Sequence, residues 1–143
     1  MLNPASLIPA NFTIGQRLER PGPALTQWSF TTFGHLHGTD APIHTDPEYA
    51  AKTPFGGTIA HGMMLLAVFE SWLCDLFGAA AWDNGANFRA KLLNTVKAGE
   101  PTTYSLEVTG RDATGITLAL ALHSGERLLA IGEVRLAWPG GTR

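Results

Sequence analysis

The chain has 143 residues, of which 45% are hydrophobic and 15% charged, and its formal net charge is −2. A chain of this length and composition is expected to fold as one compact domain over residues 1–143. Lys and Arg total 10 and form no run, which argues against a basic surface for nucleic acid. The single Cys74 cannot form an internal disulfide, and the N-terminal residues do not follow the pattern of a secretory leader, so a cytoplasmic protein is expected.

The N-terminal part of the chain predicts an extended lead-in and then short elements. Residues 1–10 hold two prolines and show no clear period, and residues 12–15 are suited to a short strand. Thr26 stands at an N-cap position before apolar residues with partly helical spacing. The pattern therefore predicts a helix that ends at Gly38 and releases the chain into a loop over residues 40–44.

Two further helices are predicted before residue 78. Asp46, followed by a proline and a glutamate, is a strong signal for the start of a short helix. Thr58 is expected to cap a long helix over residues 59–77, which would be the central apolar rod of the domain. The apolar run in this helix is interrupted by Glu70 and Asp75 and is too short for a membrane span. The apolar residues that keep helical spacing are Ile59, Met63, Leu66, Phe69, Leu73 and Phe77.

After a link rich in glycine and alanine over residues 78–85, the pattern changes to four predicted strands. They cover residues 87–93, 102–108, 115–123 and 127–138. Large apolar residues alternate with small or polar ones in the third strand, which predicts one apolar face packed on the long helix. Short turns favour an antiparallel meander. The expected fold class is α+β, with an antiparallel sheet wrapped around a long central helix.

The most informative segment is residues 38–47, where Asp40 and His44 stand four positions apart on either side of Pro42. A carboxylate and an imidazole can divide proton transfer, and the proline stiffens the backbone between them. Gly62 falls in the first turn of the long helix, where free N–H groups and the helix dipole favour a developing oxyanion. These features describe chemistry next to a carbonyl, such as addition or elimination of water through an enolate.

Two segments of the chain resemble the MaoC-like dehydratases, the family of (R)-specific enoyl-CoA hydratases. The family's hydratase motif reads Gly-Asp, any residue, Asn-Pro, an aliphatic residue and His, and an aliphatic-x-His-Gly segment opens the central helix. The matching residues are Gly38, Pro42, Ile43, His44, Asp46, Pro47, Ile59, His61 and Gly62. The resemblance covers about residues 26–138. It implies a hot-dog domain that hydrates enoyl thioesters or dehydrates 3-hydroxyacyl thioesters of coenzyme A or acyl carrier protein, with no further cofactor.

The chain departs from the family motif at the catalytic carboxylate. When Gly38 and His44 are aligned, the family's Asp falls on Thr39, and Asp40 takes the variable position. Either Asp40 replaces the carboxylate from the adjacent position, or the water-activating group is absent. Thr39 is a poor base, because its hydroxyl would first have to lose a proton. The resemblance places His44 in register for proton transfer, and the leading hypothesis is that Asp40 and His44 form the acid–base pair.

The resemblance also assigns Gly62, Thr39 and His61 to the oxyanion and substrate-binding part of the site. Each has a structural alternative. Gly62 can serve the close approach of helix and sheet, and His61 can satisfy local backbone groups at a helix start. Asp40, in turn, can act as an ordinary turn residue.

Arg89 and Lys91 share one face of a predicted strand and are candidates for holding the phosphates of coenzyme A. A solvated strand face is the alternative. No metal site is expected, because His35 and His37, two positions apart on a helix, point to different sides.

Hot-dog domains bury the open side of their sheet by pairing. The resemblance therefore implies a homodimer, or a hetero-oligomer with a related chain, that binds an acyl thioester but neither nucleic acid nor membrane. Two other functions remain open at this point. The chain is either a catalytically weak or silent subunit that binds the thioester within a heterodimer, or a thioesterase on the same fold.

Overall fold

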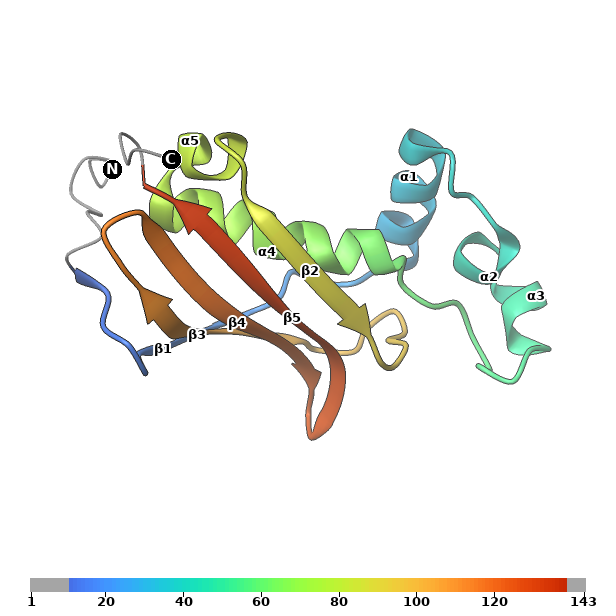
Figure 1. The fold of residues 1–143 in the computed structure, drawn as a ribbon. Helices are drawn as coiled ribbons and strands as arrows, with labels where there is room; N and C mark the ends of the chain where they lie inside the picture. Colours follow the sequence, from blue (N-terminus) through green and yellow to red (C-terminus); the bar gives the residue numbers. More distant parts are fainter. Residues whose placement is uncertain (1–10, 139–143) are drawn as a thin grey trace.

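The fold places one long helix against an antiparallel sheet. The computed structural model describes residues 11–138, and in it α4 (Gly62–Phe77) runs along one face of the sheet (Figure 1). The predicted lead-in over residues 1–10 lies outside the described residues. The predicted α+β architecture, with the sheet packed on a long central helix, is confirmed.

The sheet has five strands in the order β1-β3-β4-β5-β2, and all neighbouring strands are antiparallel. The strands are β1 (Arg17–Pro21), β2 (Asn87–Leu92), β3 (Thr103–Arg111), β4 (Gly115–Ser124) and β5 (Arg127–Ala137). The last three strands form the predicted meander. The expectation that β2 also belongs to it is wrong, because β2 pairs with β5. The segment after β2 instead reaches the start of α4, where the Ala60 N–H donates to the Val96 carbonyl over 2.9 Å.

The first strand begins later than the sequence predicts. Residues 12–15 end in a turn, in which Gly15 has a φ of 88° and the Thr13 N–H donates to the side-chain oxygen of Gln16 over 3.1 Å. This local hydrogen bond competes with strand pairing. The strand β1 therefore starts at Arg17, after the turn, and pairs with β3.

The predicted caps of two N-terminal helices are confirmed. The helices outside α4 are α1 (Gln27–His37), α2 (Pro42–Thr45), α3 (Pro47–Ala51) and α5 (Ala79–Asp83). The Thr26 hydroxyl accepts a hydrogen bond from the Ser29 N–H, and the Ser29 side chain accepts one from the Thr26 N–H. Gly38, with a φ of 66°, ends α1 in the left-handed region, and Asp46 caps α3 through two backbone N–H groups.

Three helix predictions need correction. Residues 42–45 form the short helix α2 where a loop was expected, because Pro42 stands at its first position and the Asp46 N–H donates to the Pro42 carbonyl. The expected link after α4 contains α5. The helix α4 begins at Gly62, and His61 is its N-cap in place of Thr58, because residues 58–60 are engaged with other parts of the chain. None of the helices in residues 11–138 combines the length and apolarity that a bilayer crossing requires.

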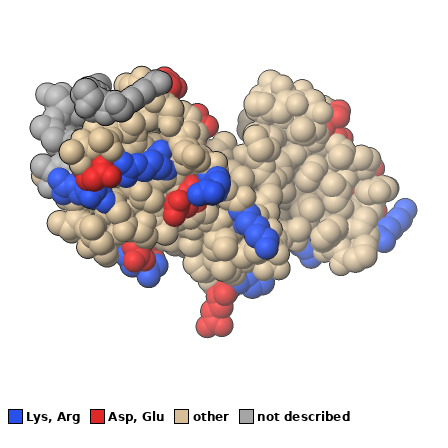
Figure 2. Space-filling model, in the orientation of Figure 1, with Lys and Arg blue, Asp and Glu red and all other residues tan. Residues whose placement is uncertain are grey.

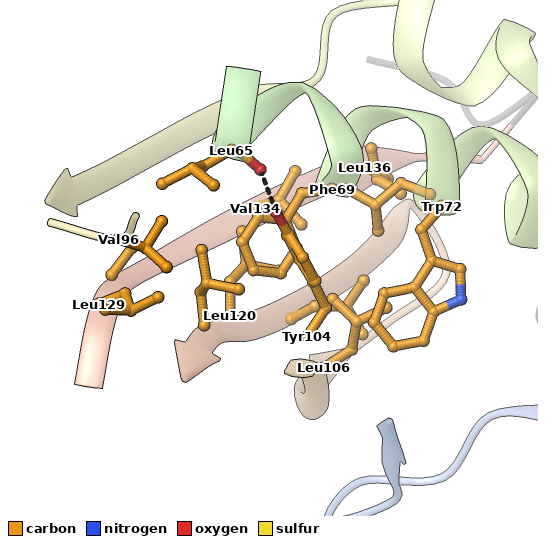
Figure 3. Close-up of a cluster of buried hydrophobic side chains, with 14 of the residues drawn as sticks. Leu65, Phe69, Trp72, Val96, Tyr104, Leu106, Leu120, Leu129, Val134 and Leu136 are labelled. Atoms are coloured by element: carbon orange, nitrogen blue, oxygen red, sulfur yellow. Dashed lines mark hydrogen bonds between the residues drawn. The ribbon is translucent and has the colours of Figure 1, made fainter. Parts of the chain in front are cut away.

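The core lies between α4 and the inner face of the sheet (Figure 3). Buried residues of β4 alternate with less buried ones, as the period of the sequence predicts, whereas β3 contains the three consecutive buried residues Tyr104, Ser105 and Leu106. The Tyr104 hydroxyl, buried among them, donates to the Leu65 carbonyl over 2.8 Å, and burial raises the pKa of Tyr104. This contact ties β3 to the first turns of α4. The start of α4, which carries Gly62, therefore has a rigid support.

Candidate active site

The segment from Gly38 to Thr45 is held against the start of α4 by long-range hydrogen bonds. The Ile59 N–H donates to the Ile43 carbonyl over 3.2 Å. The Gln27 amide donates to the His44 carbonyl over 2.9 Å, while the buried Thr58 hydroxyl donates to the Gln27 side-chain oxygen. One side chain at the start of α1 thus links the His44 segment to the chain that precedes α4. Gln27 was not among the predicted site residues, since the two partners that matter for the site lie 17 and 31 positions away from it.

His44, which lies on α2, is held in one tautomer. Its Nδ1 is 2.8 Å from the Ile59 carbonyl oxygen. A carbonyl oxygen can only accept, so this contact assigns the proton to Nδ1 and leaves a lone pair on Nε2 of the neutral ring. His44 is half-buried and lines a cavity of about 290 Å³. It is therefore equipped to take up a proton through Nε2.

The cavity beside His44 also contains the first residue of α4. Its lining residues are His44, Ile59, Ala60, Gly62, Leu65, Leu92, Leu93, Asn94 and Thr95. No hydrogen bond within residues 11–138 uses the Gly62 N–H, as expected for the first position of a helix. A Cβ atom at Gly62 would collide with the Leu92 side chain. Gly62 therefore allows the helix and the sheet to approach closely, and its N–H lies at the cavity. The predicted packing role and the predicted oxyanion role of Gly62 are compatible.

His61 is buried directly behind His44. Its side chain is 3% exposed, and its ring stacks on that of His44 with centroids 3.9 Å apart and planes at 27°. Its Nε2 lies 2.9 Å from the Phe30 carbonyl oxygen, and its Nδ1 lies 3.4 Å from the Thr39 hydroxyl. Burial lowers the pKa of His61 and is the largest effect on it. The hydrogen bond to the Phe30 carbonyl raises this pKa by less, and the neighbouring His44 lowers it further. The lowered pKa favours the neutral imidazole of His61 at neutral pH.

The structure does not bring Asp40 and His44 together. The Asp40 carboxylate lies 3.6 Å from Nδ1 of His35, and its side chain is 59% exposed. Across residues 11–138, no hydrogen bond or ion pair joins Asp40 to His44. The cause is the close return of the chain onto α1, where a Cβ at Gly34 would lie 3.1 Å from the Asp40 Cα. Of the two residues that follow Gly38, Thr39 is the one that contacts His61.

Arg89 and Lys91 lie away from the His44 cavity. They line a separate, shallow cavity of about 390 Å³ on β2 and β5. Arg89 lies 3.5 Å from the Glu133 carboxylate, which offsets its charge. Figure 2 shows Lys and Arg interspersed with Asp and Glu on the face in view, without a continuous basic patch. No group of three or more His, Cys, Asp or Glu residues in the described part of the chain is arranged to hold a metal ion.

Comparison with known families decides the membership of the chain. The family model described as "MaoC like domain" matches residues 10–120. The chain belongs to the MaoC-like dehydratase family. The (R)-specific enoyl-CoA hydratase of Aeromonas caviae is 33% identical over 102 residues, which are 68% of this chain and 75% of that protein.

A second relative matches this MaoC-like chain over a short segment. The 3-hydroxyacyl-thioester dehydratase Z of Mycobacterium tuberculosis is 50% identical over 44 residues, which are 31% of this chain and 29% of that protein. The match thus spans less than a third of that relative's length.

Solved structures share the fold of this MaoC-like chain. The R-hydratase from Pseudomonas aeruginosa in the unliganded form has a TM-score of 0.80 at 22% identity, covering 92% of this chain and 84% of that one. The ChsH1-ChsH2 complex from Mycobacterium tuberculosis has a TM-score of 0.76 at 15% identity, covering 89% and 98%. The predicted hot-dog fold is confirmed.

Proposed function

We propose that the chain hydrates enoyl thioesters or dehydrates 3-hydroxyacyl thioesters, with His44 as the proton-transferring group. The observation that carries this proposal is the fixed tautomer of His44, whose Nδ1 is 2.8 Å from the Ile59 carbonyl at a cavity shared with Gly62. Membership of the MaoC-like family and the known hydratase among its relatives support the reaction class.

Hydration begins with the thioester carbonyl at the start of α4, where the Gly62 N–H donates to its oxygen. Nε2 of His44 takes a proton from water, and the water oxygen bonds to C3 of the enoyl group. The C2–C3 π electrons move toward the carbonyl and form an enolate, which the N–H and the helix dipole stabilise. His44 then returns the proton to C2, so one water is added in total. Dehydration follows the same steps in reverse.

The size and lining of the cavity fit the reacting end of an acyl thioester. Its volume of about 290 Å³ is at the lower limit of ligand pockets, which span roughly 300–1,000 Å³. Leu65, Leu92 and Leu93 supply apolar walls next to His44. Such a cavity accepts C1 to C3 and the adjacent chain, while the carrier, coenzyme A or an acyl carrier protein, remains outside.

Turnover of trans-2-enoyl thioesters tests the proposal. The purified chain is incubated with short and medium enoyl-CoA and enoyl-acyl carrier protein substrates, and loss of the conjugated absorbance is followed. The His44→Gln variant is expected to lower kcat about 10²–10⁴-fold, because general acid–base catalysis contributes that much. His123→Gln, which changes a histidine on β4 outside the cavity, is the matched control. If the wild-type chain turned over no substrate of any length or carrier, the proposal would be abandoned.

A second function is favoured by the departure at Thr39. The family's carboxylate position holds a hydroxyl, and Asp40 faces His35. A chain with this change is suited to be the weak or silent subunit of a heterodimer. One structural neighbour, the ChsH1-ChsH2 complex, contains two differently named chains. Acyl-CoA binding without turnover, followed by turnover once a related chain is added, would favour this function. Release of free thiol would instead indicate a thioesterase.

Pairing with a second hot-dog chain is part of both proposals. Within residues 11–138, the strand β2 pairs only with β5, so its other edge is open there. Large apolar side chains lie exposed near this edge: Met63, Leu92, Leu93 and Ile131. We expect the purified chain to cover them by forming a homodimer, which is tested below.

A further inference from the structure

The hydroxyl at the family's carboxylate position is oriented by a buried histidine. Nε2 of His61 faces the Phe30 carbonyl at 2.9 Å and must donate, because a carbonyl cannot. Nδ1 of the neutral ring therefore carries a lone pair and can only accept. The Thr39 hydroxyl, 3.4 Å away, is placed to donate to it. The hydrogen of this hydroxyl is thus directed inward, and both oxygen lone pairs remain available on its exposed side.

His61 also contacts the proposed base. Its ring stacks on His44 at 3.9 Å, so the Thr39 oxygen and the His44 ring are neighbours of the same imidazole. The Nδ1 of His44 is bonded to Ile59, and its Nε2 holds a lone pair. A water that reached both groups would donate one hydrogen to Nε2 of His44 and the other to Thr39. One lone pair of the water oxygen then remains for C3 of the substrate.

We propose that Thr39 binds and orients the reacting water, or the 3-hydroxyl group in the reverse direction, and that His61 is the residue that positions Thr39. The inference rests on the proposed function. In this assignment only His44 exchanges a proton, and Thr39 keeps its own proton on the bond to His61. One hydroxyl and one neutral histidine thereby replace the carboxylate of the family motif for orientation, but not as a second base.

The neutral state of His61 and the hydroxyl at position 39 depend on each other. A carboxylate in place of Thr39 would set a negative charge against the Nδ1 lone pair and favour protonation of His61. The other titratable groups that face His61 are His44 on α2 and His37 on α1, and both disfavour a positive charge there. A hydroxyl avoids this conflict because it can donate.

Thr39→Val and Thr39→Ser form the matched pair that tests the inference. Valine keeps the shape and removes the hydroxyl, and it is expected to lower kcat about 10- to 100-fold with little change in KM, since one hydrogen bond to the reacting water is lost. Serine should retain kcat within about threefold. Thr45→Val is the control in the same segment, because the Thr45 hydroxyl donates only to the backbone carbonyls of Asp40 and Ala41.

The outcomes separate this inference from the proposed function. If Thr39→Val were as active as wild type while His44→Gln was inactive, Thr39 would have no such role and the proposed function would stand. If Thr45→Val lost as much activity as Thr39→Val, the effect would come from loop order, and the inference would also be overturned. A wild-type chain without turnover would remove both.

A readout independent of turnover is the protonation of His61. Nitrogen NMR shifts of the imidazole at neutral pH are expected to show His61 neutral with the hydrogen on Nε2. The Thr39→Asp variant should shift its titration to higher pH and add a second ionisation to the acid limb of the kcat profile. A His61 that is already an imidazolium in the wild type, or that carries its hydrogen on Nδ1, would overturn the inference.

Discussion

The two residues that follow Gly38 have opposite surroundings. Thr39 contacts the buried His61, while Asp40 faces His35 with 59% of its side chain exposed. Exposed ion pairs are worth about 0–1 kcal/mol, because solvent screens them. The charge of Asp40 is therefore weakly coupled to the histidine pair, even though Asp40 is adjacent in sequence to the position where the family has its carboxylate.

Asp40→Asn is expected to change kcat by no more than about threefold, since the substitution removes an exposed contact with His35, of small energy, and leaves His44 and Thr39 in place. Steady-state kinetics on the same enoyl thioester measures this. His35→Gln removes the same ion pair from the other side and serves as the matched control. A loss of several orders of magnitude in Asp40→Asn alone would identify Asp40 as the catalytic carboxylate after all.

The sequence analysis located His44, Gly62 and His61, because the spacing of their motifs is a property of the chain itself. The surroundings of Asp40 could not be predicted, because they depend on the approach of residues 39 and 40 to Gly34 on α1. The backbone carbonyls that bond to His44 and His61 also lie far from them in sequence. The same holds for Gln27 and the His44 carbonyl to which it donates. Motif spacing therefore predicts residues of the candidate site, while tertiary contacts determine which of them meet.

At the scale of elements, the predicted helix caps depend on local hydrogen bonds, whereas the start of α4 depends on long-range contacts. The caps at Thr26, Gly38 and Asp46 were predicted correctly, since each cap bonds within a few residues. The start of α4 was not, because Ala60 bonds to Val96, a residue of the connection between β2 and β3. The same connection carries the chain away from β2 and breaks the expected meander.

Removal of the α1 cap is expected to destabilise the chain without touching the cavity. In Thr26→Ala the Ser29 N–H loses its acceptor, which costs about 0.5–2 kcal/mol. This should lower the thermal midpoint by roughly 2–4 °C per kcal/mol for a chain of this size. Thr26→Ser keeps the hydroxyl and should unfold close to the wild type. Thermal unfolding followed by circular dichroism compares the three proteins, and equal midpoints would show that the cap is not needed.

At the scale of the whole molecule, one face of the fold is left open. The edge of β2 and the exposed side of the first turn of α4 lie next to each other, as Met63, Phe88 and Ala90 line one cavity of about 300 Å³. The side chain of Met63 is 71% exposed. Natural proteins protect unpaired strand edges, and a large exposed apolar patch marks an interaction site. The sequence indicated this need only through the family resemblance, because a pairing surface has no local signal.

Met63→Glu is expected to shift the chain from dimer to monomer, weakening association at least tenfold, because a carboxylate buried without a partner loses its hydration. Light scattering over a dilution series measures the shift. Leu36→Glu is the matched control, since Leu36 on α1 is equally apolar and 75% exposed but outside the cavity that Met63 lines. If both variants dissociated alike, or if the wild type were already monomeric, β2 and α4 would not form the interface. If only Met63→Glu dissociated, turnover by the resulting monomer would show whether one chain holds a complete site.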